Sequence, residues 1–208
     1  KNLPQVESKN LFLSKKKNSY FNGKSIGENA IEHFFQKNNF DIVYPELLSL
    51  HEFLAMLYSA KTVASISGSS AHNAIFMQRN SNLVCLNRSK HHHPLQIMIN
   101  EMRELNTSYV DTFLNFFNPN FGNGPFNIIM SKHFIRYAKH HKMQLSAKPI
   151  IYLRALTSTT LYLSYILFLG RATLILSRVT GKKQKLLFAF SILMLILLLL
   201  QLKILDYL

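Results

Sequence analysis

Short apolar runs alternate with segments of helical periodicity along the first two thirds of the chain. The apolar, β-branched runs typical of buried strands lie at residues 10–14, 40–44, 62–66 and 83–86. Helical spacing of apolar side chains follows each of them, at residues 27–38, 50–59, 71–77 and 94–105. One more helix is predicted over 131–141, after an aromatic, Asn- and Gly-rich region at 108–130. This alternation predicts an α/β fold with a Rossmann-like, doubly wound parallel sheet.

Two of the predicted helices have clear start signals. Ser49 and Glu52 have the spacing of a capping box, in which each side chain accepts a hydrogen bond from the other residue's backbone N–H. Pro94 stands at a first helical turn, where a missing N–H has no helical partner to lose. These signals indicate where the helices at 50–59 and 94–105 begin.

The turn after the third strand is the most informative local feature. The β-branched run 62–66 ends in Ser67-Gly68-Ser69-Ser70, and a helix-compatible segment follows. A strand that leads through a small-residue turn into a helix directs backbone N–H groups and hydroxyls into one crevice. In an open parallel sheet this crevice lies at the carboxyl ends of the strands, where ligands bind. The turn is therefore a candidate phosphate site.

The pattern changes after residue 149. Residues 155–169 are uncharged, and residues 186–200 are almost wholly aliphatic, with an uncharged extension to 202. A membrane span takes about 20 apolar residues, and a basic loop such as that at 171–185 favours the cytoplasmic side. We expect a hydrophobic helical tail that holds the chain at the cytoplasmic face of a membrane. The alternative is a helix pair buried against a partner surface. The predicted organisation is a frayed N-terminus, a Rossmann-like domain and this tail, at 1–9, 10–149 and 150–208.

Composition adds a strong positive charge. The chain has 24 Lys and Arg against 10 Asp and Glu, a net charge of +14. This balance suits anionic partners such as nucleotide phosphates, acidic lipid headgroups or nucleic acid. The single cysteine, Cys85, excludes a disulfide framework within the chain and fits a reducing compartment. The histidine run 91–93 has no Cys or paired acid at ligand spacing, so we expect no metal site there.

Six short segments between residues 10 and 88 occur in an informative order. They are NLFLSK at 10–15, IGENAIE at 26–32, FDIVYPELLSL at 40–50, LYSAK at 57–61, SGSSAHNAIFM at 67–77 and LVCLNR at 83–88. No single segment is specific. Together and in this order, they resemble the C-terminal part of family 61 glycosyltransferases, which include bacterial capsular polysaccharide biosynthesis proteins.

The resemblance implies one half of a GT-B-like enzyme, with the N-terminal half outside this chain. Such an enzyme transfers a sugar from a nucleotide-sugar donor to a glycan acceptor in polysaccharide biosynthesis. The end of the first strand and the small-residue turn would meet the donor, through Ser14, Lys15, Lys16, Gly68, Ser69, Ser70 and Asn73. Glu46 would follow the second strand as a contact to the ribose or the base. His72 is the candidate catalytic residue, either as the base or as a phosphate contact.

Each of these candidates also has a purely structural interpretation. His72 has the position of a histidine that is satisfied at a helix N-terminus. Lys15 and Lys16 fit a solvated basic loop. Glu46 fits a solvated residue that follows Pro45.

The chemistry of glycosyl transfer sharpens the hypothesis and its alternatives. The reaction needs stabilisation of the leaving nucleoside diphosphate and a base near the acceptor hydroxyl. Cations, hydroxyls and backbone amides can supply the first, and the chain has no Asp-x-Asp motif, so we expect no metal and no other cofactor. Two alternatives stay open: a non-catalytic, membrane-anchored interaction domain and a basic nucleic-acid-binding module. The chain lacks helix-turn-helix, zinc-finger and RNP signatures, so the main hypothesis includes no nucleic-acid partner.

Overall fold

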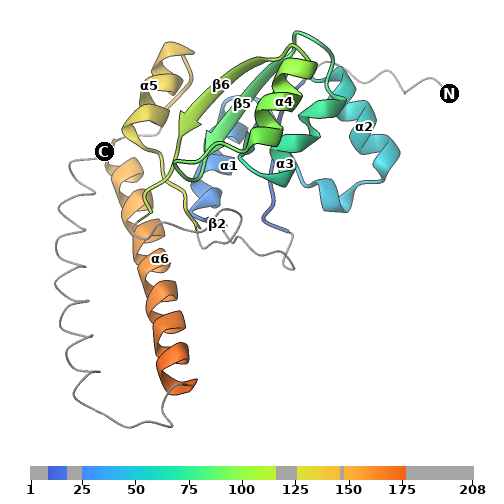
Figure 1. Ribbon diagram of the computed structural model, residues 1–208. Helices are drawn as coiled ribbons and strands as arrows, with labels where there is room; N and C mark the ends of the chain where they lie inside the picture. The colour runs from blue at the N-terminus through green and yellow to red at the C-terminus, as the bar shows by residue number, and fades with distance from the viewer. Residues whose placement is uncertain (1–8, 18–24, 116–125, 146–147, 177–208) are drawn as a thin grey trace.

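A parallel sheet forms the centre of the protein (Figure 1). The computed structural model describes residues 9–17, 25–115, 126–145 and 148–176. The sheet strands are β1 (Asn10–Leu13), β3 (Phe40–Val43), β4 (Thr62–Ile66), β5 (Asn82–Asn87) and β6 (Asn106–Asp111). They lie in the order β3-β1-β4-β5-β6, and all neighbours are parallel. The prediction of an α/β fold with a Rossmann-like parallel sheet is confirmed.

Helices cover both faces of the sheet, because successive side chains of a strand point to opposite faces. The helices are α1 (Glu28–Lys37) and α5 (Lys132–His140) on one face, and α2 (Leu50–Ser59) and α4 (Pro94–Met102) on the other. In β1, for example, Phe12 belongs to the first core and Leu11 to the second. The result is a three-layer arrangement with the carboxyl ends of all five strands at one edge.

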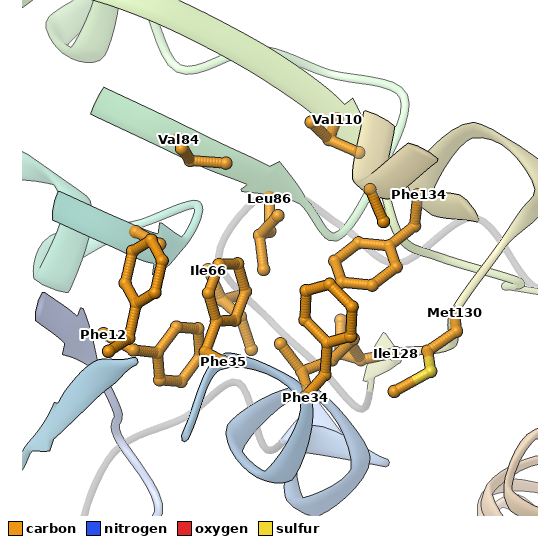
Figure 2. Packing of buried hydrophobic residues seen from close by; sticks show 14 of the residues in the cluster. Phe12, Phe34, Phe35, Ile66, Val84, Leu86, Val110, Ile128, Met130 and Phe134 are labelled. Atoms are coloured by element: carbon orange, nitrogen blue, oxygen red, sulfur yellow. The ribbon is translucent and has the colours of Figure 1, made fainter. Parts of the chain in front are cut away.

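Phenylalanine rings fill the core between the sheet and the α1–α5 layer (Figure 2). The Phe35 ring stacks on Phe12 with centroids 4.9 Å apart, and Phe34 meets Phe134 edge to face at 4.7 Å. Such aromatic pairs stabilise a fold beyond the area that they bury. These contacts hold α1 against β1 and α5, which places Glu28, the first residue of α1, beside the carboxyl end of β1.

The prediction of one helix over residues 71–77 is wrong in detail. The segment instead forms α3 (Ser69–His72), a single turn, and then a 3-10 helix, η2 (Asn73–Phe76). The Asn73 side-chain amide donates a hydrogen bond to the carbonyl of Ser70 at 3.2 Å. Asparagine side chains compete in this way with helical backbone bonds, which accounts for the early change of helix type.

Residues 106–111 form β6, a strand that the sequence pattern does not predict. This strand pairs with β5 over six residues, from Asn82 opposite Asn106 to Asn87 opposite Asp111. It is an edge strand, and Val110 is its one fully buried residue. An edge strand with one buried side chain needs no run of apolar residues. The hydrophobic pattern therefore does not indicate this strand.

A second small sheet holds the long C-terminal helix of the described chain. The sheet pairs β2 (Ser25–Ile26) with β7 (Phe126–Asn127), and α6 (Lys148–Leu176) packs on both strands. The Ser158 hydroxyl lies 2.7 Å from Asn127 Oδ1, and the Asn127 amide donates to Thr159 Oγ1 at 3.1 Å. Because these groups are buried, their pairing fixes the position of α6.

The first turns of α6 also reach the main core. Ile151 is buried in the phenylalanine cluster, so contacts cross the predicted domain boundary between residues 149 and 150. The later turns of α6 extend beyond the α/β layers (Figure 1). Within the described ranges, no helix has the length and hydropathy that a membrane span requires. The aliphatic segment 186–202 lies outside the described residues.

Candidate functional site

Two cationic side chains meet beside Gly68 at the carboxyl end of the sheet. Lys15 follows β1, Gly68 follows β4 and Arg88 follows β5, and these three strands are neighbours. A Cβ atom on Gly68 would lie 3.0 Å from Lys15 Nζ and 3.1 Å from Arg88 Nη2. Gly68 has φ +125°, a conformation that favours glycine. The glycine therefore leaves open a space that both cations border.

Burial makes this pair of cations electrostatically unusual. Burial and, to a smaller extent, the charge of the neighbouring Arg88 together lower the pKa of Lys15 to about 8, and Glu28 opposes them in part. Burial also lowers the pKa of Arg88, whose guanidinium stacks over the Phe126 ring at 4.2 Å. In the described part of the chain neither cation forms an ion pair. An anion between them would relieve both the repulsion and the desolvation.

A buried serine links the end of β1 to two glutamates of α1. The Ser14 hydroxyl lies 3.0 Å from Glu28 Oε1 and 2.5 Å from Glu32 Oε1, and it accepts the backbone N–H of Lys16 at 3.1 Å. Glu28 Oε1 also accepts the N–H of Lys15 at 3.1 Å. Burial raises the pKa of Glu28, which favours its neutral form. The network fixes the backbone that carries Lys15 and leaves the charge of that lysine only partly balanced.

His72 borders the same cations. Burial lowers its pKa, and the charges of His93, Lys15 and Arg88 lower it further, so the imidazole is neutral at pH 7. Its Nε2 atom is buried and has no hydrogen-bond partner within the described ranges. The His93 ring lies 4.7 Å away, and His93 Nδ1 accepts the N–H of Leu95 at 3.2 Å. A buried, unpartnered ring nitrogen is a group that a ligand can satisfy.

The other predicted site residues have different surroundings. Lys16 Nζ lies 3.6 Å from Glu32 Oε2 of α1. Glu46 is exposed in the 3-10 helix η1 (Pro45–Leu47), beyond β3. Ser69 is exposed in α3, whereas Ser70 is buried and Asn73 binds its carbonyl. Contacts and charge interactions thus connect Ser14, Lys15, Gly68 and His72, and Ser69 and Ser70 directly follow Gly68 in the chain.

Sequence reasoning missed three residues that take part in these contacts: Arg88, Glu28 and Glu32. Arg88 stands two residues after the last apolar residue of a predicted strand. This place directly after a strand is the one sequence feature that could have indicated Arg88 as a site residue. The glutamates have the spacing of one helical face in the first predicted helix. Nothing in the sequence indicates that Ser14 reaches both of them.

The histidine run at 91–93 does not build a metal centre with other ligands. Throughout the described residues, no three His, Cys, Asp or Glu side chains lie close enough together to hold a metal ion. His92 instead packs against the Tyr109 ring, with centroids 4.9 Å apart.

The fold and the site together define an α/β domain with two partly buried cations beside a glycine turn at the carboxyl ends of parallel strands. Comparison with known families adds a specific relation: the family model Glycosyltransferase 61 matches residues 1–85. The match runs from before β1 into β5, and it includes Lys15 and Gly68. It supports a member of glycosyltransferase family 61 and, in general terms, a glycosyltransferase role. No curated protein matches the chain.

Proposed function

We propose that this protein binds the diphosphate of a nucleotide-sugar between Lys15, Gly68 and Arg88 and transfers the sugar to a glycan acceptor. The observation that carries the proposal is the convergence of two partly buried cations on a glycine turn. A diphosphate matches this site because its charge offsets both cations, and Arg88 offers a planar set of donors to phosphate oxygens. The family match supplies the reaction class.

The site residues would act mainly on the leaving group. When the bond between the sugar and the phosphate breaks, negative charge grows on the diphosphate, and Lys15 and Arg88 stabilise that charge. The backbone at Gly68 approaches the phosphate closely because no side chain intervenes. The neutral His72 ring adds a nitrogen at the edge of the site, as a phosphate contact or as a base.

The wider setting is also a proposal. In it, the chain is the donor-binding half of a GT-B-like enzyme of capsular polysaccharide biosynthesis, as the sequence resemblance implies. Segment 186–202 anchors it at the cytoplasmic face of a membrane, with lysines 182, 183 and 185 against anionic lipid. A charge at the centre of a spanning helix costs about 2.5–3.5 kcal/mol. Membrane flotation of Leu197→Lys beside the parent chain therefore tests the anchor.

A panel of nucleotide-sugars tests the proposed reaction class. The full chain is incubated with uridine, guanosine, adenosine and cytidine nucleotide-sugars and a mixture of oligosaccharide acceptors. Release of one nucleoside diphosphate together with a glycosylated product supports the proposal. The absence of both release and nucleoside diphosphate binding across the panel contradicts it.

A further inference from the structure

A wide polar cavity lies beside the proposed donor site. It has a volume of about 970 Å³ and runs along α1 and the free edge of β3. The described residues that line it are Lys9, Asn10, Lys16, Asn29, Glu32, His33, Gln36, Asn39, Phe40, Asp41, Ile42 and Tyr44. We call it the α1–β3 groove. All but two of these residues carry polar side chains, so the groove offers both hydrogen-bond donors and acceptors. That mixture suits a ligand rich in hydroxyl groups.

The groove adjoins the donor site through consecutive residues. Lys15 borders Gly68, whereas Lys16 lines the groove, and neighbouring Cα atoms lie about 3.8 Å apart. The Ser14 network connects the two sites as well, because Glu28 binds the backbone N–H of Lys15 while Glu32 lines the groove. The groove and the donor site therefore share the chain segment that follows β1.

Glu32 is held in the groove wall by surrounding groups. Its carboxylate contacts the Ser14 hydroxyl at 2.5 Å and Lys16 Nζ at 3.6 Å. Its side chain retains 10% of its exposure, so it faces the groove from a largely buried position. A fixed carboxylate that is partly open to a cavity has the geometry of a general base.

The hydrogen count at Ser14 indicates that one of the two glutamates carries a proton. One hydroxyl hydrogen faces carboxyl oxygens of both Glu28 and Glu32, so it can be donated to only one of them. The second short contact requires a proton on the other carboxyl. Burial favours the neutral form of Glu28, so Glu28 is the carboxyl that carries this proton. The Ser14 hydroxyl then donates its hydrogen bond to Glu32.

We propose that the α1–β3 groove binds the hydroxyl-bearing acceptor and that Glu32 is the catalytic base, so that of its two possible roles His72 has that of a phosphate contact. This inference rests on the proposed function. In the step, the acceptor oxygen forms a bond to the anomeric carbon of the sugar, and the bond from that carbon to the phosphate oxygen breaks. The acceptor proton moves to Glu32, and the leaving diphosphate takes the bonding electron pair, with its charge held by Lys15 and Arg88.

The test separates chemistry from donor binding in the full chain. Glu32→Gln removes the base and keeps the shape of the side chain, and Glu101→Gln on the exposed surface of α4 is the matched control. Release of nucleoside diphosphate from the nucleotide-sugar panel should fall about 100-fold or more in Glu32→Gln. The Kd of the free nucleoside diphosphate should stay within about twofold, and Glu101→Gln should change neither quantity.

Each outcome decides a different claim. Equal release by Glu32→Gln and the parent chain overturns the catalytic assignment. So does a parent chain that binds nucleoside diphosphate but releases none from any nucleotide-sugar with the acceptor mixture, although the donor site then stands. A parent chain that binds no nucleoside diphosphate overturns the proposed function and this inference with it.

A second variant keeps the inference testable if Glu32→Gln does not fold. Gln36→Trp adds bulk to the groove from an exposed position of α1. It should raise the KM for the acceptor mixture and leave the Kd of the nucleoside diphosphate unchanged. An unchanged acceptor KM overturns the assignment of the groove.

Discussion

The two ends of the parallel sheet differ in how their charged side chains are paired and buried. At the amino end, Lys9 pairs with Asp41 at 3.3 Å, and Arg79 pairs with Glu104 at 3.2 Å, with every side chain roughly half exposed. At the carboxyl end, Lys15 and Arg88 are partly buried and repel each other.

This difference separates ordinary surface charge from functional charge. Exposed ion pairs contribute about 0–1 kcal/mol each to the free energy of unfolding and are screened by salt. The ion pairs at the amino end therefore have little effect on stability. Partly buried cations without a counterion destabilise the fold, because desolvation is not offset. Such an arrangement persists where a ligand supplies the missing charge. The comparison therefore supports the proposal that a ligand binds at the carboxyl end.

Gly27 is the position where we expect the largest effect on stability. It lies directly before α1 and has φ +98°, and a Cβ there would approach the Ile128 carbonyl oxygen to 2.1 Å and Ser158 Oγ to 2.3 Å. Gly27→Ala should lower the free energy of unfolding by about 3–5 kcal/mol, from backbone strain and overpacking. Asn80→Ala is the amino-end control, since Asn80 also has positive φ but is exposed, and should lose about 1–2 kcal/mol. Urea denaturation measures both, and equal losses would remove the contrast.

Gly68 should affect binding more than stability. Gly68→Ala forces Lys15 and Arg88 apart and places a methyl group in the proposed phosphate position. The strained φ should cost about 1–2 kcal/mol of stability, while the affinity for a nucleoside diphosphate should fall about tenfold or more. Calorimetric titration beside circular dichroism checks the two effects. Retained affinity in a folded variant would show that the turn does not contact phosphate.

The titration of Lys15 predicts a pH dependence of binding. Since the Lys15 pKa is about 8, this side chain loses its charge as the pH rises above that value. A terminal phosphate is fully charged above its own pKa of about 6, so the ligand does not change in this range. Affinity for a nucleoside diphosphate should fall about tenfold between about pH 7 and pH 9.5. In Lys15→Met this fall should be absent.

Stability without ligand should follow the opposite trend. Between the folded pKa of about 8 and the usual value of 10.5, the unfolded chain binds more protons at Lys15 than the folded chain does. The free energy of unfolding of the parent chain, relative to Lys15→Met, should therefore increase with pH over this range. A flat difference between the two proteins would mean that Lys15 is fully solvated.

Glu28 should show the smallest effect. If burial keeps this carboxyl neutral, Glu28→Gln replaces an acid by a neutral group of the same shape. The free energy of unfolding at pH 7 should change by less than about 1 kcal/mol, whereas Glu28→Ala should lose about 1–3 kcal/mol because Ser14 and the Lys15 N–H lose a partner. A large loss in Glu28→Gln would instead indicate an ionised Glu28 that balances Lys15.

Sequence reasoning succeeded where a local rule decides the structure. The capping box of Ser49 and Glu52 forms as predicted, and the four strands with apolar runs are all present. β6 was missed because an edge strand with one buried side chain carries no such run.

The candidate site was only partly predictable for a related reason. Lys15 and Gly68 could be chosen from their places after strands, since parallel strands end at one edge of the sheet. Arg88 follows the same rule but stands at the end of β5, and no turn pattern marked it. The Ser14–Glu28–Glu32 network depends on how α1 packs on β1, which a sequence pattern does not specify.

Isothermal titration of nucleoside diphosphates into the full chain tests the central claim most directly. The parent protein is compared with the double variant Lys15→Met, Arg88→Met and with Lys61→Met, an exposed lysine at the amino end of the sheet. We predict that at least one of UDP, GDP, ADP and CDP binds the parent and Lys61→Met equally, and that the double variant loses about 100-fold or more in affinity. Equal affinity in the double variant, or no binding of any nucleoside diphosphate to the parent, would contradict the assignment of the carboxyl end as the donor site.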